Sequence, residues 1–386
     1  MAAGNSFEHC MKCTLCNDYC PVAKVNPSFP GPKALGPDGE RYRLKDAAFY
    51  DAMARYCLNC KRCEVACPSD VKIADLILNA KLKYGGRHHV LRNAALSYTD
   101  FVGTLGTAFS PVANAAASMM FHRGPRYATR TFEKIYASQV KWEEQSKFAG
   151  TVAFFHGCYV NYNNPQLGLD MVKVLNSLGI GVKLLAKEQC CGIALISNGF
   201  VKQAERQARV NLDSIRECVK AGLPVLTTST TCVFTIRDEY EHVLGLDVSD
   251  VRNSVMTATK YICSLLDGGA RLNFRRNLPS LKIAYHVPCH LEKLGWAMYT
   301  VALLKMIPGV ELTVLDSACC GVAGAYGFKG ENRKISRDVG ENLFKQIREL
   351  SPDIVVTDCE TCRWQIEMNT EANVMHPLTL LASSIE

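Results

Sequence analysis

The chain has 386 residues, of which 48% are hydrophobic and 21% are charged, so it can bury a substantial core and form two or three domains. Its formal charge of +7 is a mild basic excess, and no basic stripe with interleaved aromatic residues is present, which excludes the usual pattern of nucleic-acid binding. We expect no signal peptide, because the first residues lack a basic region followed by an apolar stretch. Nineteen unevenly spaced cysteines therefore indicate metal-bound thiolates in a reducing compartment rather than disulfides.

Eight cysteines in residues 1–83 form two runs with identical spacing. Each run reads C-x2-C-x2-C-x3-C and ends before a proline, Pro21 or Pro68. Bacterial two-cluster ferredoxins have this spacing, in which three thiolates bind one [4Fe–4S] cluster and the fourth reaches the other. We therefore predict two clusters with crossed ligands, the first bound by Cys10, Cys13, Cys16 and Cys67, and the second by Cys57, Cys60, Cys63 and Cys20.

Structural zinc is the main alternative for these pairs of cysteines, but it would explain neither the repetition of the full run nor the terminal prolines. Two oxidised clusters would lower the net charge to about +3. The proline-rich stretch between the runs predicts an extended loop, with a helix near Asp46 and another at 73–80, where apolar residues form a stripe. The domain 1–83 is thus expected to be mainly helical.

Residues 84–150 contain no cysteine and are predicted to be a helical linker. The uncharged stretch 101–121 is diluted by glycine, serine, threonine, asparagine and proline, which argues against a spanning helix. Its large apolar residues recur at helical spacing, and basic residues flank it. This pattern indicates either a helix in the membrane surface or one that packs on this protein or a partner. The apolar stripe contains Phe101, Leu105, Phe109, Val112 and Met119, and the basic residues are Arg87, Arg92, Arg123, Arg126 and Arg130.

Two cysteine-rich halves follow, at 151–270 and 281–386, and they share one plan. Five landmarks of the second half each lie 129 to 131 residues after their counterparts in the first, which indicates duplication. Each half alternates short apolar strands with helices, so we expect a parallel α/β sheet in each and an α+β multidomain chain overall. The predicted strands are 152–155, 182–185, 225–228, 283–285, 312–315 and 354–357, and the predicted helices are 166–178, 201–221, 291–306 and 334–350.

Each half contains a Cys-Cys-Gly sequence, and we call them the first and second CCG halves. The five cysteines of the second half exceed the four that a cubane needs, which favours an additional iron–sulfur cluster of unusual geometry, with zinc or free thiols as alternatives. The first half is a weaker candidate, because Ser229 stands where the second has Cys359. The two sets are Cys289, Cys319, Cys320, Cys359 and Cys362, and Cys158, Cys190, Cys191 and Cys232.

Three histidines lie beside the leading cysteines of these halves, namely His156, His286 and His290. They are candidates to bind metal or to hydrogen-bond a cluster or quinone, although such histidines are more often satisfied polar groups at a strand end. Cys218 and Cys263 fall inside expected helices and are predicted to be core residues.

The chain resembles the iron–sulfur subunits of anaerobic glycerol-3-phosphate dehydrogenases over nearly its whole length. The resemblance rests on the double cysteine run, on both CCG sequences, and on GPDGERYRLKD from Gly36, CKRCEVACPSDVKI from Cys60, FFHGCYVNYNNPQLG from Phe154 and TDCETCRWQIEM from Thr357. It implies a non-catalytic electron-transfer subunit that works with a flavin-containing catalytic subunit and a second subunit. It also implies electron delivery to menaquinone and peripheral attachment to the cytoplasmic face of the bacterial inner membrane.

No G-x-G-x-x-G follows a strand, so we expect neither flavin nor NAD on this chain. The CCG halves alone are less specific, since they also resemble iron–sulfur subunits of lactate and glycolate oxidases and of heterodisulfide reductase. Two alternatives therefore stay open. One is the same role in a lactate or glycolate system, and the other is an enzyme that acts at a CCG-half cluster. A scaffold with structural metals only is a further possibility.

Overall fold

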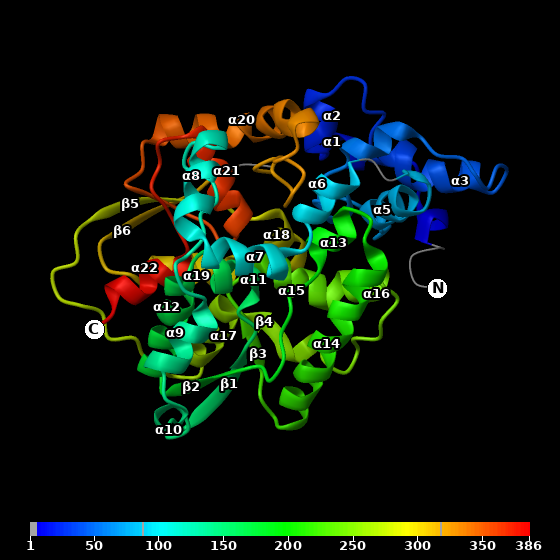
Figure 1. Ribbon diagram of the computed structural model, residues 1–386. Coiled ribbons are helices and arrows are strands. Elements are labelled where there is room, and N and C mark those ends of the chain that lie inside the picture. Colours follow the sequence, from blue (N-terminus) through cyan, green and yellow to red (C-terminus); the bar gives the residue numbers. More distant parts are fainter. Residues whose placement is uncertain (1–5, 87–88, 317–318) are drawn as a thin grey trace.

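The computed structural model describes residues 6–86, 89–316 and 319–386. An N-terminal helical part lies beside two larger α/β parts, and the linker helices run across the face that Figure 1 presents. The mixed architecture confirms the predicted α+β class, with two parallel sheets of four strands each. Arg87, one of the basic residues predicted to flank the linker, lies outside the described residues.

The N-terminal part is helical throughout its regular structure in the described residues. The predicted extended loop is wrong in part, because Pro21 begins a helix, where its missing N–H has no cost, and Pro37 lies inside another. The helix predicted near Asp46 is also wrong, since the Asp46 side chain accepts a hydrogen bond from Ala48 N and forms a turn. The elements are η1 Ser6–His9, α1 Leu15–Asp18, α2 Pro21–Val25, η2 Ala34–Asp38, α3 Gly39–Arg43, η3 Ala52–Tyr56, α4 Arg62–Val65 and α5 Ile73–Tyr84.

The two cysteine runs repeat in conformation as well as in sequence. In each run the residues on both sides of the second cysteine have a left-handed backbone conformation. The φ angle is 63° at Lys12 and 66° at Thr14 in the first run, and 52° at Asn59 and 61° at Lys61 in the second. Non-glycine residues adopt this region rarely, so its recurrence at matched positions marks a local geometry that the surrounding structure imposes. The short helices α1 and α4 begin directly after these residues.

The linker forms five helices, and the uncharged stretch breaks into two of them at Phe109. Gly103 and Gly106 on α7 face the protein so closely that a Cβ atom would lie 2.4 Å from the Tyr162 ring and 2.6 Å from the Tyr127 ring. Small residues therefore face inward, and large apolar residues face outward. No helix in the described part of the chain is both long and apolar enough to cross a bilayer. The helices are α6 Val90–Ala95, α7 Thr99–Ala108, α8 Ser110–Met120, α9 Phe132–Gln139 and α10 Trp142–Gln145.

The first CCG half contains a parallel sheet in the order β2-β1-β3-β4. All three predicted strands and both predicted helices are present, while β4 was not predicted. The elements are β1 Gly150–Phe154, α11 Gly157–Tyr162, α12 Pro165–Ser177, β2 Ile180–Leu184, α13 Ile193–Ser197, α14 Val201–Lys220, β3 Val225–Thr227, α15 Thr230–Phe234, η4 Thr235–Glu239, α16 Tyr240–His242, η5 Arg252–Ser254, β4 Val255–Thr257 and α17 Ala258–Asp267.

The second CCG half repeats this plan in the order β6-β5-β7-β8. The predicted strands are present, but the helix predicted over 291–306 is two helices, because Gly295 adopts a left-handed conformation between them. The elements are β5 Leu281–Tyr285, α18 Cys289–Leu294, α19 Ala297–Met306, β6 Val310–Val314, η6 Gly330–Asn332, α20 Arg333–Leu350, β7 Ile354–Val356, α21 Glu360–Asn369, β8 Val374–Met375 and α22 Pro377–Ser384.

The two CCG halves share one hydrophobic core, which runs from β1 and α12 to β5 and α22. Polar contacts at the edge of this core also join α12 to α22. Thr379 Oγ1 donates to Asp170 Oδ2 at 2.7 Å, and Lys173 Nζ donates to the carbonyl of Ala382 at 2.9 Å. Because strand ends of both sheets carry the cysteine loops, this packing brings the loops of the two halves close together.

A buried charge cluster joins the N-terminal part to both CCG halves. Lys61, fully buried, makes ion pairs with Asp75 of α5 and with Glu239 of the first half, whose Oε1 lies 3.2 Å from Lys61 Nζ. Glu64 Oε1 lies 3.9 Å from the same ammonium group and accepts from Ala74 N at 2.9 Å, so it also caps α5. The other oxygen of Glu64 lies 3.3 Å from Lys293 Nζ of the second half. We call Lys61, Glu64, Asp75 and Glu239 the Lys61 cluster.

We predict that Lys61→Met lowers the free energy of unfolding by about 3–5 kcal/mol, because three buried carboxylates would lose their common ammonium partner. The measurement is chemical denaturation of anoxic protein followed by circular dichroism. Lys334→Met is the matched control, since Lys334 makes only an exposed pair with Asp338. Equal stability of the two variants would contradict the structural role of the Lys61 cluster.

Candidate metal centres

Four cysteines from the two runs surround a small cavity near the N-terminus. Cys10, Cys13 and Cys16 reach it from the first run, and Cys67 reaches it from the end of the second. The lining also contains Met11, Thr14, Lys33, Pro68, Ser69 and Ile73. This grouping is the crossed set predicted for the first cluster.

The other four cysteines surround a second small cavity. Cys57, Cys60 and Cys63 meet Cys20 there, with apolar residues such as Val22 and Phe29 around them. The fourth cysteine of each run thus lies in the cavity of the other run, which is the arrangement that the crossed prediction requires.

The cysteine side chains in these cavities are suited to binding a metal cluster rather than to remaining free thiols. Burial and the neighbouring thiols Cys10, Cys67 and Cys13 raise the pKa of Cys16 to about 11, and burial with Cys60 raises the pKa of Cys20 to about 12. Thiols with such raised pKa values become thiolates only if positive charge enters the cavity. The residues therefore fit an iron–sulfur cluster in each cavity.

The two cavities differ in their access to solvent. In the first cavity Cys13 is exposed, Cys10 and Cys67 are half-buried and Cys16 is buried, whereas the second cavity has no exposed cysteine: Cys57 and Cys60 are half-buried, and Cys20 and Cys63 are buried. A cluster in the first cavity would lie nearer to the surface than one in the second.

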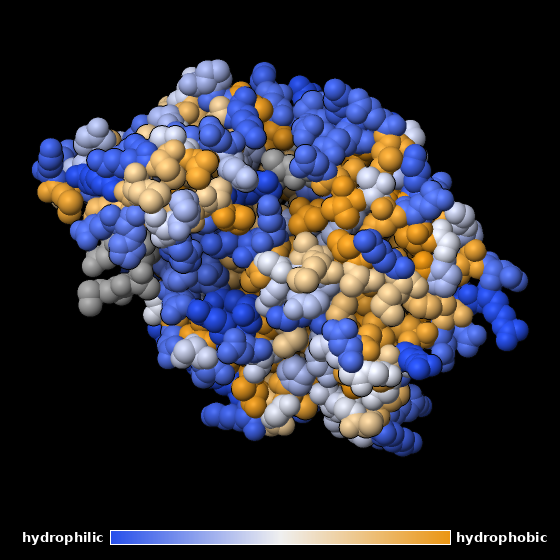
Figure 2. All heavy atoms as spheres, turned by 180° about the vertical axis from the view of Figure 1, so that it is seen from behind, coloured by the Kyte–Doolittle hydropathy of each residue, from blue (hydrophilic) through white to orange (hydrophobic). Residues whose placement is uncertain are grey.

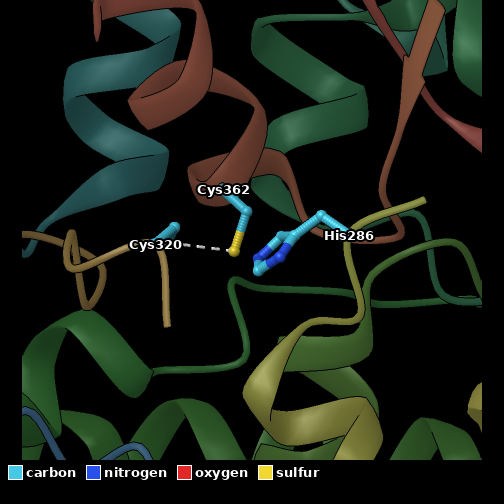
Figure 3. A group of neighbouring side chains, drawn as sticks. All are labelled: His286, Cys320 and Cys362. Carbon is cyan, nitrogen blue, oxygen red and sulfur yellow. Dashed lines mark hydrogen bonds between the residues drawn. The ribbon is translucent and has the colours of Figure 1, made fainter. Parts of the chain in front are cut away.

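Five cysteines of the second CCG half converge beside the second cavity. Cys289 begins α18, Cys319 and Cys320 follow β6, and Cys359 caps α21, where its sulfur accepts from Cys362 N at 3.5 Å. The sulfurs of Cys320 and Cys362 lie 3.1 Å apart and face each other (Figure 3). Cys319 is within hydrogen-bonding reach of Cys289. Cys319 also reaches Cys60 of the N-terminal part. This contact joins the second cavity to the second CCG half.

Only one of the three candidate histidines approaches a cysteine set in the described structure. A ring nitrogen of His286 lies within 4.8 Å of the sulfurs of Cys320 and Cys362, and burial lowers the pKa of His286 to about 4, so the imidazole is neutral (Figure 3). His156 instead pairs with Glu188 at 3.1 Å, and His290 stacks on Phe234 at 4.6 Å. These two histidines have structural partners, as expected for polar groups at strand ends.

The first CCG half gathers Cys158, Cys190, Cys191 and Cys232. The sulfurs of Cys158 and Cys190 lie 3.7 Å apart, and Cys191 is within hydrogen-bonding reach of Cys190 and Cys232. Ser229, in place of a fifth cysteine, caps α15 by accepting from Cys232 N at 3.2 Å. Four thiols and one hydroxyl group therefore surround this site.

Sequence reasoning missed two carboxylates at the first-half site. Asp100 of α7 accepts from Cys190 N at 2.8 Å, and burial raises the pKa of this carboxyl to about 7. Glu360 comes from the second half and meets Ser229. Both approach through packing between segments far apart in the chain, for which the cysteine spacing contains no signal.

The two remaining cysteines lie apart from these sets. Cys263 of α17 donates to the carbonyl of Tyr299 at 3.2 Å, and Cys218 packs at the edge of the first half's core. Both therefore occupy the structural positions expected of them.

Comparison with known proteins agrees with this division of the chain. Residues 6–71 match a 4Fe-4S dicluster domain, and residues 152–237 and 283–367 each match a cysteine-rich domain named CCG. The chain is 53% identical to one subunit of the anaerobic glycerol-3-phosphate dehydrogenase of Escherichia coli K12, over 98% of this chain and 99% of the relative. The chain belongs to the family of that dehydrogenase subunit.

More distant relatives are also iron–sulfur or heterodisulfide reductase subunits by name. The glycolate oxidase iron–sulfur subunit of Escherichia coli K12 is 24% identical over all of this chain and 96% of its own length. One subunit of a heterodisulfide reductase from Methanosarcina barkeri is 28% identical over 57% of this chain and 54% of its own length. The 4Fe-4S dicluster match and the two cysteine-rich CCG matches support iron–sulfur clusters as the cofactors of this member of the dehydrogenase subunit family.

We predict that double substitutions separate crossed from uncrossed ligation. With crossed ligands, Cys20→Ser/Cys57→Ser removes two ligands of one cluster and should lose about four irons, as each single variant does. Cys13→Ser/Cys20→Ser damages both clusters and should lose about eight. The measurement is iron and acid-labile sulfide per chain in anoxically purified protein. The reverse pattern would show that each run binds its own cluster.

Proposed function

We propose that this chain is the electron-transfer subunit of a glycerol-3-phosphate dehydrogenase complex. In this proposal a flavin-containing catalytic subunit oxidises glycerol-3-phosphate, a second subunit joins the complex, and this chain passes the electrons to menaquinone. The observation that carries the proposal is the pair of four-cysteine cavities in a chain whose family is that of a glycerol-3-phosphate dehydrogenase subunit. We place substrate chemistry on the partner, because a dehydrogenase needs a hydride acceptor and this sequence has no glycine-rich pattern for binding one.

The arrangement of the cysteine sets supports one order for the relay. The first cavity, near exposed Cys13, receives electrons from the partner, and the second cavity receives them from the first. The contact between Cys60 and Cys319 then leads into the second CCG half, where Cys289, Cys319, Cys320, Cys359 and Cys362 would hold a further cluster. An iron–sulfur cluster supplies one-electron chemistry, and the protein residues place the clusters in sequence.

The outward face of α7 and α8 is the part of the chain that we propose contacts the membrane. Its large apolar side chains are exposed, with 65% of Phe101, 64% of Phe109, 72% of Val112 and 84% of Met119 open to solvent. Apolar surface also gathers on the opposite face of the molecule, so exposure by itself is not distinctive (Figure 2). What distinguishes α7 and α8 is that small residues face the protein while the large ones face away.

Some of the basic residues beside this face already bind other groups of the protein. Arg92 pairs with Glu331 at 2.8 Å, and Arg123 donates to the carbonyl of Ala372 at 2.8 Å. Arg126 and Arg130 form no ion pair with an acidic residue in the described part of the chain, and so they remain available to anionic headgroups. The proposal therefore places the chain peripherally on the cytoplasmic face of the inner membrane.

We predict that Phe101→Ser/Phe109→Ser weakens binding to anionic lipid vesicles at least about tenfold, because two phenyl rings would no longer enter the interface. Vesicle flotation of the full chain measures the change. Leu44→Ser is the control, since Leu44 is comparably exposed but lies in the N-terminal part. Unchanged flotation with lost capture of the catalytic partner would show that this face binds the partner instead.

The proposed function is tested by reconstituting the chain with its catalytic partner under anoxic conditions. Glycerol-3-phosphate should reduce the clusters, as EPR detects, and a menaquinone analogue should reoxidise them. The control is the same mixture without the catalytic partner. Reduction by lactate or glycolate, but not by glycerol-3-phosphate, would overturn the proposal.

A further inference from the structure

A carboxylate of the second CCG half lies at the cysteine site of the first. Glu360 is the first residue of α21 and directly follows Cys359, yet its side chain meets Ser229 of the first half. Ser229 Oγ lies 3.0 Å from Glu360 Oε1 and 3.1 Å from Oε2. The backbones of the two loops also meet, since Thr230 N donates to the carbonyl of Asp358 at 3.5 Å. The loop that follows β3 in the first half therefore contacts the matched loop that follows β7 in the second half.

Glu360 has no cationic partner in the part of the chain that the structure describes. Its hydrogen-bond partner is the neutral hydroxyl of Ser229, and the neighbouring Arg363 is committed to Glu367 at 3.0 Å and to the Tyr159 hydroxyl. Ser229 Oγ also accepts from Cys232 N at 3.2 Å, so the same hydroxyl contacts both the Glu360 carboxylate and the backbone of a cysteine of the first-half site. Glu360 is half-buried, and a carboxylate removed from water in part, without a cationic partner, is costly unless a proton or a metal compensates it.

The position of Glu360 matches the ligand that the first half lacks. The second half has five cysteines, whereas the first has four thiols and Ser229 in place of the fifth. Both oxygens of Glu360 lie within hydrogen-bonding distance of this hydroxyl, which occupies the place where a cysteine at position 229 would present its sulfur. Carboxylate oxygens bind iron in proteins, so Glu360 brings the first site to five donor residues.

We propose that Glu360, carried by the second CCG half, is an oxygen ligand of an iron–sulfur centre held in the first half by Cys158, Cys190, Cys191 and Cys232. The site is then built from both halves and is complete only when they are packed together. Ser229 serves as a positioning residue that orients the carboxylate. The proposed relay uses the N-terminal clusters and the second half, so it and this centre can fail independently.

The test compares iron, acid-labile sulfide and low-temperature EPR spectra of the anoxically purified full chain and its variants. Cys191→Ser defines the iron and the signal that belong to the first-half centre. Glu360→Ala and Glu360→Gln should each lose that same iron and signal, while the signals of the N-terminal clusters persist and show that the chain is folded. Glu367→Gln, on the same helix, is the matched control and should leave both unchanged.

Two further variants distinguish a metal ligand from a residue that only supports the structure of the site. Ser229→Ala should keep the iron, because the carboxylate remains, and Ser229→Cys/Glu360→Ala should regain it, because a thiolate replaces the lost oxygen. The proposal is overturned if Glu360→Ala and Glu360→Gln retain the wild-type iron content, or if Ser229→Ala loses as much as they do. It is equally overturned if Cys191→Ser loses no iron, or if zinc is the metal that this half contains.

Discussion

The position of the N-terminal part depends on one buried ammonium group, that of Lys61. Removing this charge from water costs several kcal/mol, and the cost is offset only where carboxylates meet it with good geometry. Asp75 belongs to α5 and Glu239 to the first CCG half, so the ion pairs form only when these parts are correctly docked. Lys293 of the second half reaches Glu64 and extends the same constraint to that half. Because Lys61 directly follows Cys60, docking the ammonium group also brings Cys60 to Cys319.

The backbone conformation of Lys61 links its buried ion pairs to the geometry of the second cysteine run. Lys61 and its counterpart Thr14 both have a left-handed conformation, which is costly for residues with a side chain. At Lys61 the buried ion pairs compensate for this cost, whereas the first run lies near the surface and has no comparable cluster in the described residues. The second run is therefore the more rigidly held of the two. In the proposed relay the second cluster is the central one, and this rigidity would keep its ligands at fixed positions relative to the next set.

The sequence predicted the features that depend on local spacing. The double run predicted which cysteines share a cavity, and the constant offset between the halves predicted two similar parallel sheets. It did not predict β4 and β8, which are strands of only two or three residues. It also missed the break at Phe109 and the roles of Lys61, Glu239 and Glu360. The contacts of these three charged residues join segments far apart in the chain, and no local pattern of hydrophobicity or spacing specifies such packing.

The duplication explains both what was predictable and what was not. Two copies of one α/β plan place their cysteine loops at equivalent strand ends, so the residue types of each site follow from alignment of the copies alone. Packing the copies through one core makes these loops neighbours, and each copy then supplies groups to the surroundings of the other. The surroundings of the two cysteine loops are therefore coupled, because Glu360 is adjacent to Cys359 in the chain and contacts Ser229 in space. If Glu360 serves the first-half site as proposed, the facing loop supplies the donor that Ser229 does not, and the asymmetry between Ser229 and Cys359 is a property of the pair of halves rather than of one half alone.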